Sequence, residues 1–357
     1  MATLFSIRPA TRNIGNDLIG HATTALLLEH FGADTSIVTV PALADGRFGG
    51  LTAPQIHDIN RFGDGVVIGG GNVFENGQLT TDLDALTALR VPLMLLGVSH
   101  GRVYDAAGKL VERTDAMPPA VIRALTRRAA VTLVRDAETG ARLRELGIAD
   151  AQVGGCSSLF LPANVPAAAD GGQVLLSLRH PEQMNVSAEL QWRVADDVRR
   201  LIAALEARFG RIVTLVCHDY RDLAFAAAFP QTPHLYFDDV QRYVAALRAS
   251  RLCVTYRLHA FLPCVAFGTP AVNISYDERS RAAVATAGMA AWDIDLTRVD
   301  DLVGVVMARV CDLERYAELR ATAQRDIAVL RTRTDAGIAR FRALVSGDLE
   351  APALAGV

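Results

Sequence analysis

The chain has 357 residues, of which 51% are hydrophobic and 21% are charged, and its formal net charge is −3. This composition is typical of packed globular domains and excludes a disordered chain, and the absence of a basic excess excludes a nucleic-acid-binding protein. The length exceeds what one hydrophobic core usually supports, so it predicts two domains of roughly 150 residues each.

The N-terminus lacks a basic stretch followed by an apolar one, and charged residues interrupt every long apolar run. We therefore expect neither a secretory signal nor a transmembrane helix. The five cysteines are scattered and show no zinc-binding spacing, which predicts free thiols, a reducing cytoplasmic location and no metal or other cofactor. Peripheral contact with a membrane surface and homo-oligomerisation stay open.

In the first half of the chain, short apolar runs alternate with longer stretches of helical periodicity. Strands are expected at residues 3–7, 36–40, 65–68, 92–97 and 131–134, and helices at 17–30 and 137–146. The second helix has a capping residue at Asp136 and a terminating glycine at Gly147. Such alternation is typical of a parallel sheet covered by helices.

A stretch rich in Pro, Ala and Gly, residues 162–172, is interpreted as a linker, and a second alternating series follows it. Strands are expected at 173–178, 211–217, 234–237, 252–255 and 271–274, helices at 191–209 and 240–250, and almost continuous helix at 300–346. The prediction is an α/β protein with two Rossmann-like domains facing a cleft, at 1–162 and 172–300, and C-terminal helices at 301–346.

Three motifs in the first half place glycine and polar side chains after expected strands. They are Asn-Ile-Gly-Asn-Asp at 13–17, Ile-Gly-Gly-Gly-Asn at 68–72 and Gly-Val-Ser-His-Gly at 97–101. Glycine lets a ligand approach the backbone, and the carboxyl ends of parallel strands border the ligand crevice. The alternatives are a capped helix start, a tight structural turn and a solvated loop histidine. The candidate residues are Asn13, Asp17, Gly70, Gly71, Asn72, Ser99 and His100.

Two motifs in the second half also follow expected strands. Arg179 ends the first of these strands, where a guanidinium can grip a carboxylate or phosphate, and His218 follows the second. A surface ion pair is the alternative reading of Arg179. Cys217 precedes His218, and nothing in the sequence marks it as an activated thiol.

The strongest motif is Thr-Tyr-Arg-Leu-His, residues 255–259, at the junction of a strand and an apolar helix. Arg257, Leu258 and His259 lie at the start of this helix, whose free amides and dipole favour an anion. Histidine can also donate a proton near neutral pH. Costly polar groups at the start of a buried helix favour a binding site over chance.

Together these motifs resemble the polysaccharide pyruvyl transferases. The resemblance rests on 13–17, on 67–72, on Val-Arg-Asp-Ala-Glu-Thr at 134–139, on Arg-Leu-His-Ala at 257–260, and on 268–277 with Ser-Tyr-Asp. Their order and spacing agree from about residue 10 to residue 290. The Arg-Leu-His segment with the downstream Gly-Thr-Pro strand is the most specific part.

The resemblance implies a GT-B-like fold, phosphoenolpyruvate as the donor and a carbohydrate hydroxyl pair as the acceptor, which becomes a cyclic ketal. It implies that the second domain holds the donor through Arg179, Arg257, Leu258 and His259. It also implies that the first domain holds the acceptor through Asn13, Asp17, Gly70, Gly71 and Asn72. On this reading His259 is the candidate acid and Asp17 the candidate base.

The chain departs from the family pattern in two places. It reads Gly-Asn-Asp at 15–17 where many relatives have Gly-Asp, and Gly-Cys-Ser-Ser at 155–158 without the acidic residue that many relatives carry nearby. A family member with an altered donor or acceptor is therefore one alternative. A second alternative is a GT-B-type glycosyltransferase that uses a nucleotide sugar, although the sequence shows no evident acidic residue to hold the ribose. A third is a catalytically silent binding subunit.

Overall fold

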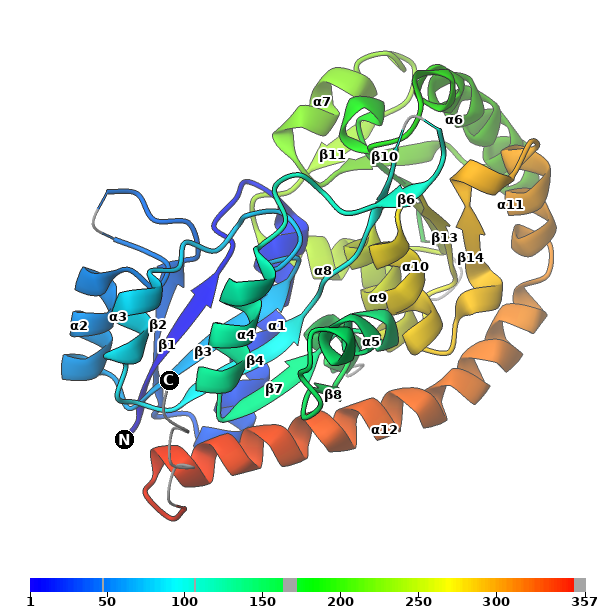
Figure 1. Cartoon of the computed structure of the whole chain (residues 1–357). Coiled ribbons are helices and arrows are strands. Elements are labelled where there is room, and N and C mark those ends of the chain that lie inside the picture. Colours follow the sequence, from blue (N-terminus) through cyan, green and yellow to red (C-terminus); the bar gives the residue numbers. More distant parts are fainter. Residues whose placement is uncertain (47, 106, 163–171, 350–357) are drawn as a thin grey trace.

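The computed structural model describes residues 1–46, 48–105, 107–162 and 172–349. It contains two six-stranded parallel sheets, one in each half of the chain, and one short antiparallel hairpin (Figure 1). The predicted linker at 162–172 falls, apart from its two end residues, outside the described residues. The expected pair of Rossmann-like sheets is confirmed.

The first sheet has the strand order β2-β1-β3-β4-β7-β8. Its strands are β1 (Thr3–Arg8), β2 (Ser36–Pro41), β3 (Gly65–Gly71), β4 (Leu93–Val98), β7 (Val131–Val134) and β8 (Gln152–Val153). The helices of this half are α1 (Ile14–Phe31), α2 (Ala53–Phe62), α3 (Leu83–Thr87), α4 (Pro119–Arg128) and α5 (Ala137–Glu145). β3 and β4 are buried along their whole length, which explains their unbroken apolar and glycine sequences.

The second sheet has the strand order β11-β10-β9-β12-β13-β14. Its strands are β9 (Val174–Leu178), β10 (Val213–Cys217), β11 (His234–Tyr236), β12 (Leu252–Thr255), β13 (Ala271–Ser275) and β14 (Asp293–Asp295). The helices of this half are α6 (Ala188–Phe209), α7 (Tyr220–Ala226), α8 (Val240–Ala249), α9 (Leu258–Phe267) and α10 (Glu278–Thr286). The described residues also include four short 3-10 helices: η1 (Ser157–Phe160), η2 (Pro181–Gln183), η3 (Ala290–Trp292) and η4 (Leu296–Arg298).

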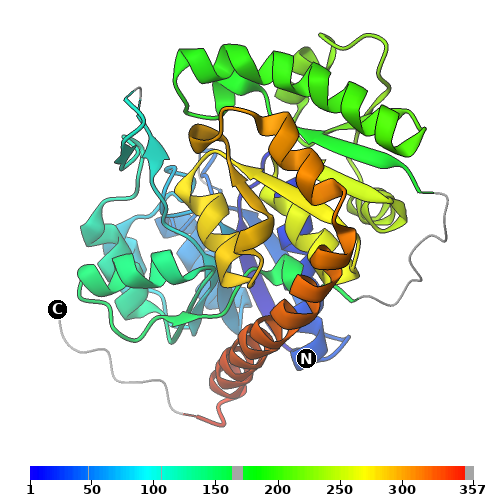
Figure 2. The same cartoon turned by 90° about the vertical axis from the view of Figure 1, so that its right-hand side faces the viewer.

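Two C-terminal helices, α11 (Leu302–Val310) and α12 (Leu313–Val345), follow the second sheet. Figures 1 and 2 show α12 running along both halves of the molecule. Near its start the Tyr316 hydroxyl donates to the Thr269 carbonyl at 2.9 Å, and further on Thr334 Oγ1 donates to the Gly154 carbonyl at 2.9 Å. Phe341 is buried with Leu4 of β1. α12 therefore returns to the first half and packs against both sheets.

The strand orders fix where a ligand can bind. In the first sheet, the direction in which successive strands are added changes between β1 and β3, because β2 lies on one side of β1 and β3 on the other. In the second sheet it changes in the same way between β9 and β12. In open α/β sheets a crevice forms at such a switch point, at the carboxyl ends of the two strands, because the connections that follow these strands run in opposite directions. Each half of the molecule therefore has one such crevice.

Most predicted strands agree with the structure to within a few residues. The sequence did not indicate β8, β14 or the hairpin strands β5 (Val103–Tyr104) and β6 (Leu110–Val111), because two- or three-residue strands carry no readable periodicity. The hairpin reaches the second half, where the Tyr104 hydroxyl donates to Asp295 at 3.2 Å. In the described part of the chain, none of the helices has the length and apolarity needed to span a membrane.

Candidate active site

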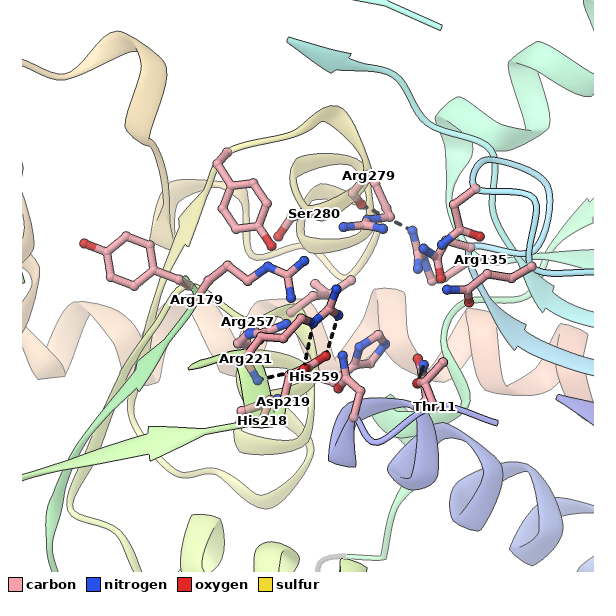
Figure 3. Close-up of a pocket in the computed structure, with 18 residues that line it drawn as sticks. Thr11, Arg135, Arg179, His218, Asp219, Arg221, Arg257, His259, Arg279 and Ser280 are labelled. Carbon is pink, nitrogen blue, oxygen red and sulfur yellow. Dashed lines mark hydrogen bonds and ion pairs between the residues drawn. The ribbon is translucent and has the colours of Figure 1, made fainter. Parts of the chain in front are cut away.

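A polar pocket lies where the two switch points face each other. Figure 3 shows Thr11 and Arg135 on one side of this pocket and Arg179, Arg221 and His218 on the opposite side. The first half contributes Thr11, Asn13, Asn16, Asn72, Asn76, Gln78 and Arg135. The second half contributes Arg179, His218, Asp219, Arg221, Tyr256, Arg257, Leu258, His259, Tyr276, Arg279 and Ser280.

The N-terminus of α1 joins the two halves at the pocket. The Asn13 side chain caps this helix by accepting from the Gly15 amide at 3.0 Å, and the Ile14 amide donates to the His218 carbonyl at 3.0 Å. A Cβ atom on Gly15 would lie 3.1 Å from the His259 Cβ atom. Glycine here allows the histidine of α9 to pack directly over the first turn of α1.

Arg257 is a fixed cation at the start of α9. Its Nε donates to the Leu178 carbonyl at 2.9 Å, and its guanidinium forms an ion pair with the buried carboxylate of Asp222. Asp222 also accepts from the backbone amides of His180 and His218, at 3.0 and 3.2 Å. Because the carboxylate is held by several donors, it sets the position of Arg257 at the carboxyl ends of β9 and β12.

Arg179 carries the charge that the pocket leaves uncompensated. Its guanidinium donates only to the Gln183 carbonyl, at 3.3 Å from Nε and 3.2 Å from Nη2. Among the described residues no carboxylate lies within ion-pair distance of it. Burial, and next the charge of Arg257, lower the pKa of Arg179 to about 10, so the group is still a cation at neutral pH. An anion bound here would relieve both penalties.

The other pocket arginines are each paired with carboxylates. Arg221 contacts Asp219 at 2.6 Å, and Arg135 contacts Asp136 at 3.3 Å. Arg279 lies between Asp277, at 2.8 Å, and Glu75 of the first half, at 3.5 Å. Since these pairs, like that of Arg257 with Asp222, largely cancel, the uncompensated positive charge of the pocket lies at Arg179.

Arg179 and Arg257 form a wall of the pocket that we call the arginine wall, and the start of α9 adds backbone donors to it. Arg257 occupies the cap position, but its side chain makes no capping hydrogen bond. The amides of Leu258 and His259 donate to no acceptor among the described residues and are available to an anion, which the helix dipole favours, whereas the Ala260 amide donates to the Arg257 carbonyl at 2.9 Å.

His259 is neutral in the free protein. Burial, followed by the charges of Arg135, Arg279 and Arg257, lowers the pKa of His259 to about 3. Its Nε2 lies 3.8 Å from the sulfur of Cys156, the buried residue that precedes η1. A bound anion would offset the arginine charges and raise the pKa of this imidazole.

His218 is also neutral, because burial lowers its pKa well below the usual value. Its Nε2 lies 2.9 Å from Ser177 Oγ and 3.0 Å from the Tyr243 hydroxyl oxygen. That hydroxyl donates its proton to the His259 carbonyl at 2.8 Å, so it must accept from His218 Nε2. The tautomer this selects leaves His218 Nδ1 as a hydrogen-bond acceptor.

The structure brings seven of the residues selected from the sequence into the pocket lining: Asn13, Asn72, Arg179, His218, Arg257, Leu258 and His259. It does not bring Asp17, Gly70, Gly71, Ser99 or His100 there. Asp17 faces outward on α1, where Arg8 Nη1 donates to its carboxylate at 3.2 Å. Its position thus gives no support to a role as the catalytic base.

Ser99 and His100 lie behind the pocket wall. Ser99 Oγ donates to the Gly71 carbonyl at 3.2 Å, and it also lies 3.2 Å from Glu75, the carboxylate that pairs with Arg279. His100 is buried, and its Nε2 lies 3.7 Å from Glu112, the residue after β6. Ser99 therefore contacts the carboxylate that pairs with a pocket arginine, and neither Ser99 nor His100 lines the pocket.

Replacement of Gly70 with alanine is expected to destabilise the fold, because Gly70 serves packing. Its φ is +55°, and a Cβ atom would lie 2.1 Å from Ile19 Cγ2. The strained backbone and the overlap with α1 should together cost about 2–4 kcal/mol of unfolding free energy. Chemical denaturation measures this, with Gly108→Ala as the matched control, since Gly108 also has positive φ but no neighbour within 4 Å. Equal losses in both variants would contradict the packing argument.

Sequence reasoning missed several pocket residues. Arg135 lies in a motif quoted for its family likeness, Arg279 lies two residues after the end of another, and Asn76 and Gln78 follow the glycine loop. The position of Arg135 directly after a strand was the available signal. Nothing in the sequence near Arg279 indicates its contact with Glu75. Among the described residues there is no group of three His, Cys, Asp or Glu side chains that could hold a metal ion.

Comparisons with known proteins agree with this arrangement. The family model for polysaccharide pyruvyl transferase matches residues 13–278. No curated protein sequence matches the chain significantly.

Solved structures similar in fold include an S. aureus MnaA–UDP complex, with a TM-score of 0.56, 13% identity, and coverage of 90% of this chain and 91% of that one. The UDP-GlcNAc 2-epimerase from Neisseria meningitidis bound to UDP-GlcNAc has a TM-score of 0.56, 12% identity and coverage of 98% and 100%. The epimerase from Methanocaldococcus jannaschii with UDP-GlcNAc and UDP has a TM-score of 0.54, 11% identity and coverage of 86% and 92%. At such identities the likeness concerns the fold alone, and it confirms the GT-B-like arrangement.

Proposed function

The chain belongs to the polysaccharide pyruvyl transferase family, and from this premise we propose that it transfers a pyruvyl group from phosphoenolpyruvate to two hydroxyls of a sugar or glycan precursor. The product is a cyclic ketal and the leaving group is inorganic phosphate. The observation that carries the proposal is Arg179, a cation in the pocket with no carboxylate partner, beside the fixed cation Arg257.

The donor fits this wall by charge. Phosphoenolpyruvate carries a carboxylate and a phosphate, and the wall offers two guanidinium groups and the free amides at the start of α9. Bidentate contacts from arginine suit both anionic groups. We assign Arg179, Arg257 and the Leu258 amide to donor binding.

The proposed chemistry begins with protonation of the donor methylene, which becomes a methyl group. One acceptor hydroxyl then forms a C–O bond to the electron-poor central carbon. The second hydroxyl forms the other C–O bond as the bond to phosphate breaks, which closes the ring. One hydroxyl proton leaves with the phosphate, and the other replaces the proton that the acid gave to the methylene, so no oxidant or reductant is required.

His259 is our candidate for the acid. The free protein holds it neutral, with a pKa of about 3, so it must gain a proton when the donor binds. The bound anion opposes the charges of Arg135, Arg279 and Arg257 that lower this pKa, and it thereby stabilises the imidazolium. The acid would thus be charged only when substrate is present.

Asp17 does not enter this scheme, because its carboxylate is paired with Arg8 outside the pocket lining. The phosphate of the donor can take the acceptor proton instead, since the second pKa of a phosphate monoester lies near 6 and the group is mostly a dianion at neutral pH. The donor would then supply its own base.

A thermal-shift experiment with phosphoenolpyruvate, UDP-GlcNAc and UDP tests the donor class. We expect phosphoenolpyruvate to raise the melting temperature, since a ligand at a hundredfold excess over its Kd stabilises by about 2.7 kcal/mol. Stabilisation only by the uridine nucleotides would favour a nucleotide-sugar enzyme instead. Stabilisation by none of them would favour a non-catalytic binding subunit.

A further inference from the structure

The wall that the first half contributes to the pocket differs in character from the arginine wall. Arg135 is its one charged lining residue, and that guanidinium is paired with Asp136. The remaining lining residues of this half are uncharged: Thr11, Asn13, Asn16, Asn72, Asn76 and Gln78. This wall therefore offers hydrogen bonds without attracting anions.

Two of its carboxamides already have structural tasks. Asn13 caps α1, and Asn16 Nδ2 donates to Thr11 Oγ1 at 2.6 Å. The other three, Asn72, Asn76 and Gln78, come from the loop that connects β3 to α3. They follow the glycines at the end of β3, directly at the switch point of the first sheet.

The side-chain oxygens of Asn76 and Gln78 are buried and accept no hydrogen bond from the described residues. A buried acceptor without a donor is unfavourable and rare in native proteins, and it calls for a specific explanation. Both residues line the same pocket, so one ligand bound there could supply donors to both oxygens once the side chains turn toward it. That ligand must supply hydrogen-bond donors.

We propose that Asn76 and Gln78, assisted by Asn72, bind the two hydroxyls of an uncharged sugar acceptor and so determine which diol receives the pyruvyl group. This inference rests on the proposed function. A hydroxyl both donates and accepts, as a carboxamide does, whereas a fully ionised carboxylate or phosphate cannot donate to an amide oxygen. Each ligand thus has its own side of the pocket. The anionic donor binds the arginine wall, and the neutral diol binds the opposite wall with Asn72, Asn76 and Gln78.

Replacement of these side chains should not harm the fold. Neither amide oxygen has a partner in the free protein, so Asn76→Ala and Gln78→Met remove no hydrogen bond of those oxygens and relieve two buried unpaired acceptors. We expect melting temperatures at or above that of the unchanged protein, whereas loss of a structural residue would lower them.

Binding of each ligand is measured separately. Saturation-transfer NMR detects binding of a panel of methyl glycosides of glucose, galactose, mannose and N-acetylated hexosamines in the presence of phosphoenolpyruvate. Calorimetry measures the Kd of phosphoenolpyruvate alone. The variants are Asn76→Ala, Gln78→Met and the double variant. Gln324→Ala removes an exposed amide on α12 and is the matched control.

We expect at least one glycoside to bind the unchanged protein and the control, and each variant to weaken it about tenfold or more while the Kd of phosphoenolpyruvate changes less than about twofold. Three results would overturn the inference: no glycoside binds, glycoside binding survives both replacements, or the variants lose phosphoenolpyruvate instead. If the unchanged protein did not bind phosphoenolpyruvate, the proposed function would be rejected instead. Failure of the inference and failure of the proposed function therefore give different results.

Discussion

Replacing Arg179 with glutamine is expected to weaken the binding of phosphoenolpyruvate by about 1.5–3 kcal/mol, roughly a ten- to hundredfold rise in Kd. The reason is that Arg179 is the pocket arginine whose charge no carboxylate cancels, so the ligand is its counter-ion. Among the described residues its guanidinium bonds only to the Gln183 carbonyl, and glutamine can keep a donor there. The fold should therefore tolerate the change. Calorimetric titration with phosphoenolpyruvate measures it.

Arg221 provides the matched comparison in the same pocket. It donates to both oxygens of Asp219, at 2.8 and 2.6 Å, so its charge is already compensated. Arg221→Gln should change the Kd less than about tenfold. If both variants lost affinity equally, the binding would reflect the total charge of the pocket and not the unpaired state of Arg179.

Replacing His259 with asparagine is expected to lower kcat by roughly 10²–10⁴ and to change the Kd of phosphoenolpyruvate much less. The free protein holds the imidazole neutral, so the replacement removes no charge that attracts the donor. What it removes is the group that gains a proton in the complex. Steady-state kinetics with measurement of released phosphate, beside the exposed His57→Asn as control, separates the two effects.

The pH dependence gives a second view of the same residue. An acid acts when protonated, so kcat should be highest below the pKa of His259 in the complex and should fall as the pH rises through it. This pKa lies above the free value of about 3, because the bound anion offsets the neighbouring arginines. His259→Asn should abolish this descending limb. If the limb persisted in the variant, another group would be the acid.

The sequence was most informative where a motif coincides with the end of a strand. The apolar strands and the Arg-Leu-His motif are local features, and they place Arg257, Leu258 and His259 correctly in the pocket. Asp17 belongs to a motif at the pocket, but it lies one turn of α1 beyond Asn13, where its carboxylate pairs with Arg8 and does not line the pocket. Its role as the base stays a prediction.

Contacts between distant segments could not be predicted. Asp222 fixes Arg257 only because α7 and α9 begin after β10 and β12, the two strands that flank β9 at the carboxyl edge of the second sheet. Arg279 reaches Glu75 only because α10 faces the first half. The sequence around Gly70 indicates ligand binding. In the structure, however, glycine is required at this position because a Cβ atom would overlap with Ile19.

Transfer of pyruvyl carbon to a glycan is the central claim, and mass spectrometry tests it most directly. The protein is incubated with isotope-labelled phosphoenolpyruvate and a pool of glycan precursors from its own host. The account predicts a product that gains the mass of labelled pyruvate less one water, formed by the unchanged protein and not by Arg257→Ala. Labelled carbon found only in free pyruvate and unreacted donor, with no labelled glycan, would contradict it.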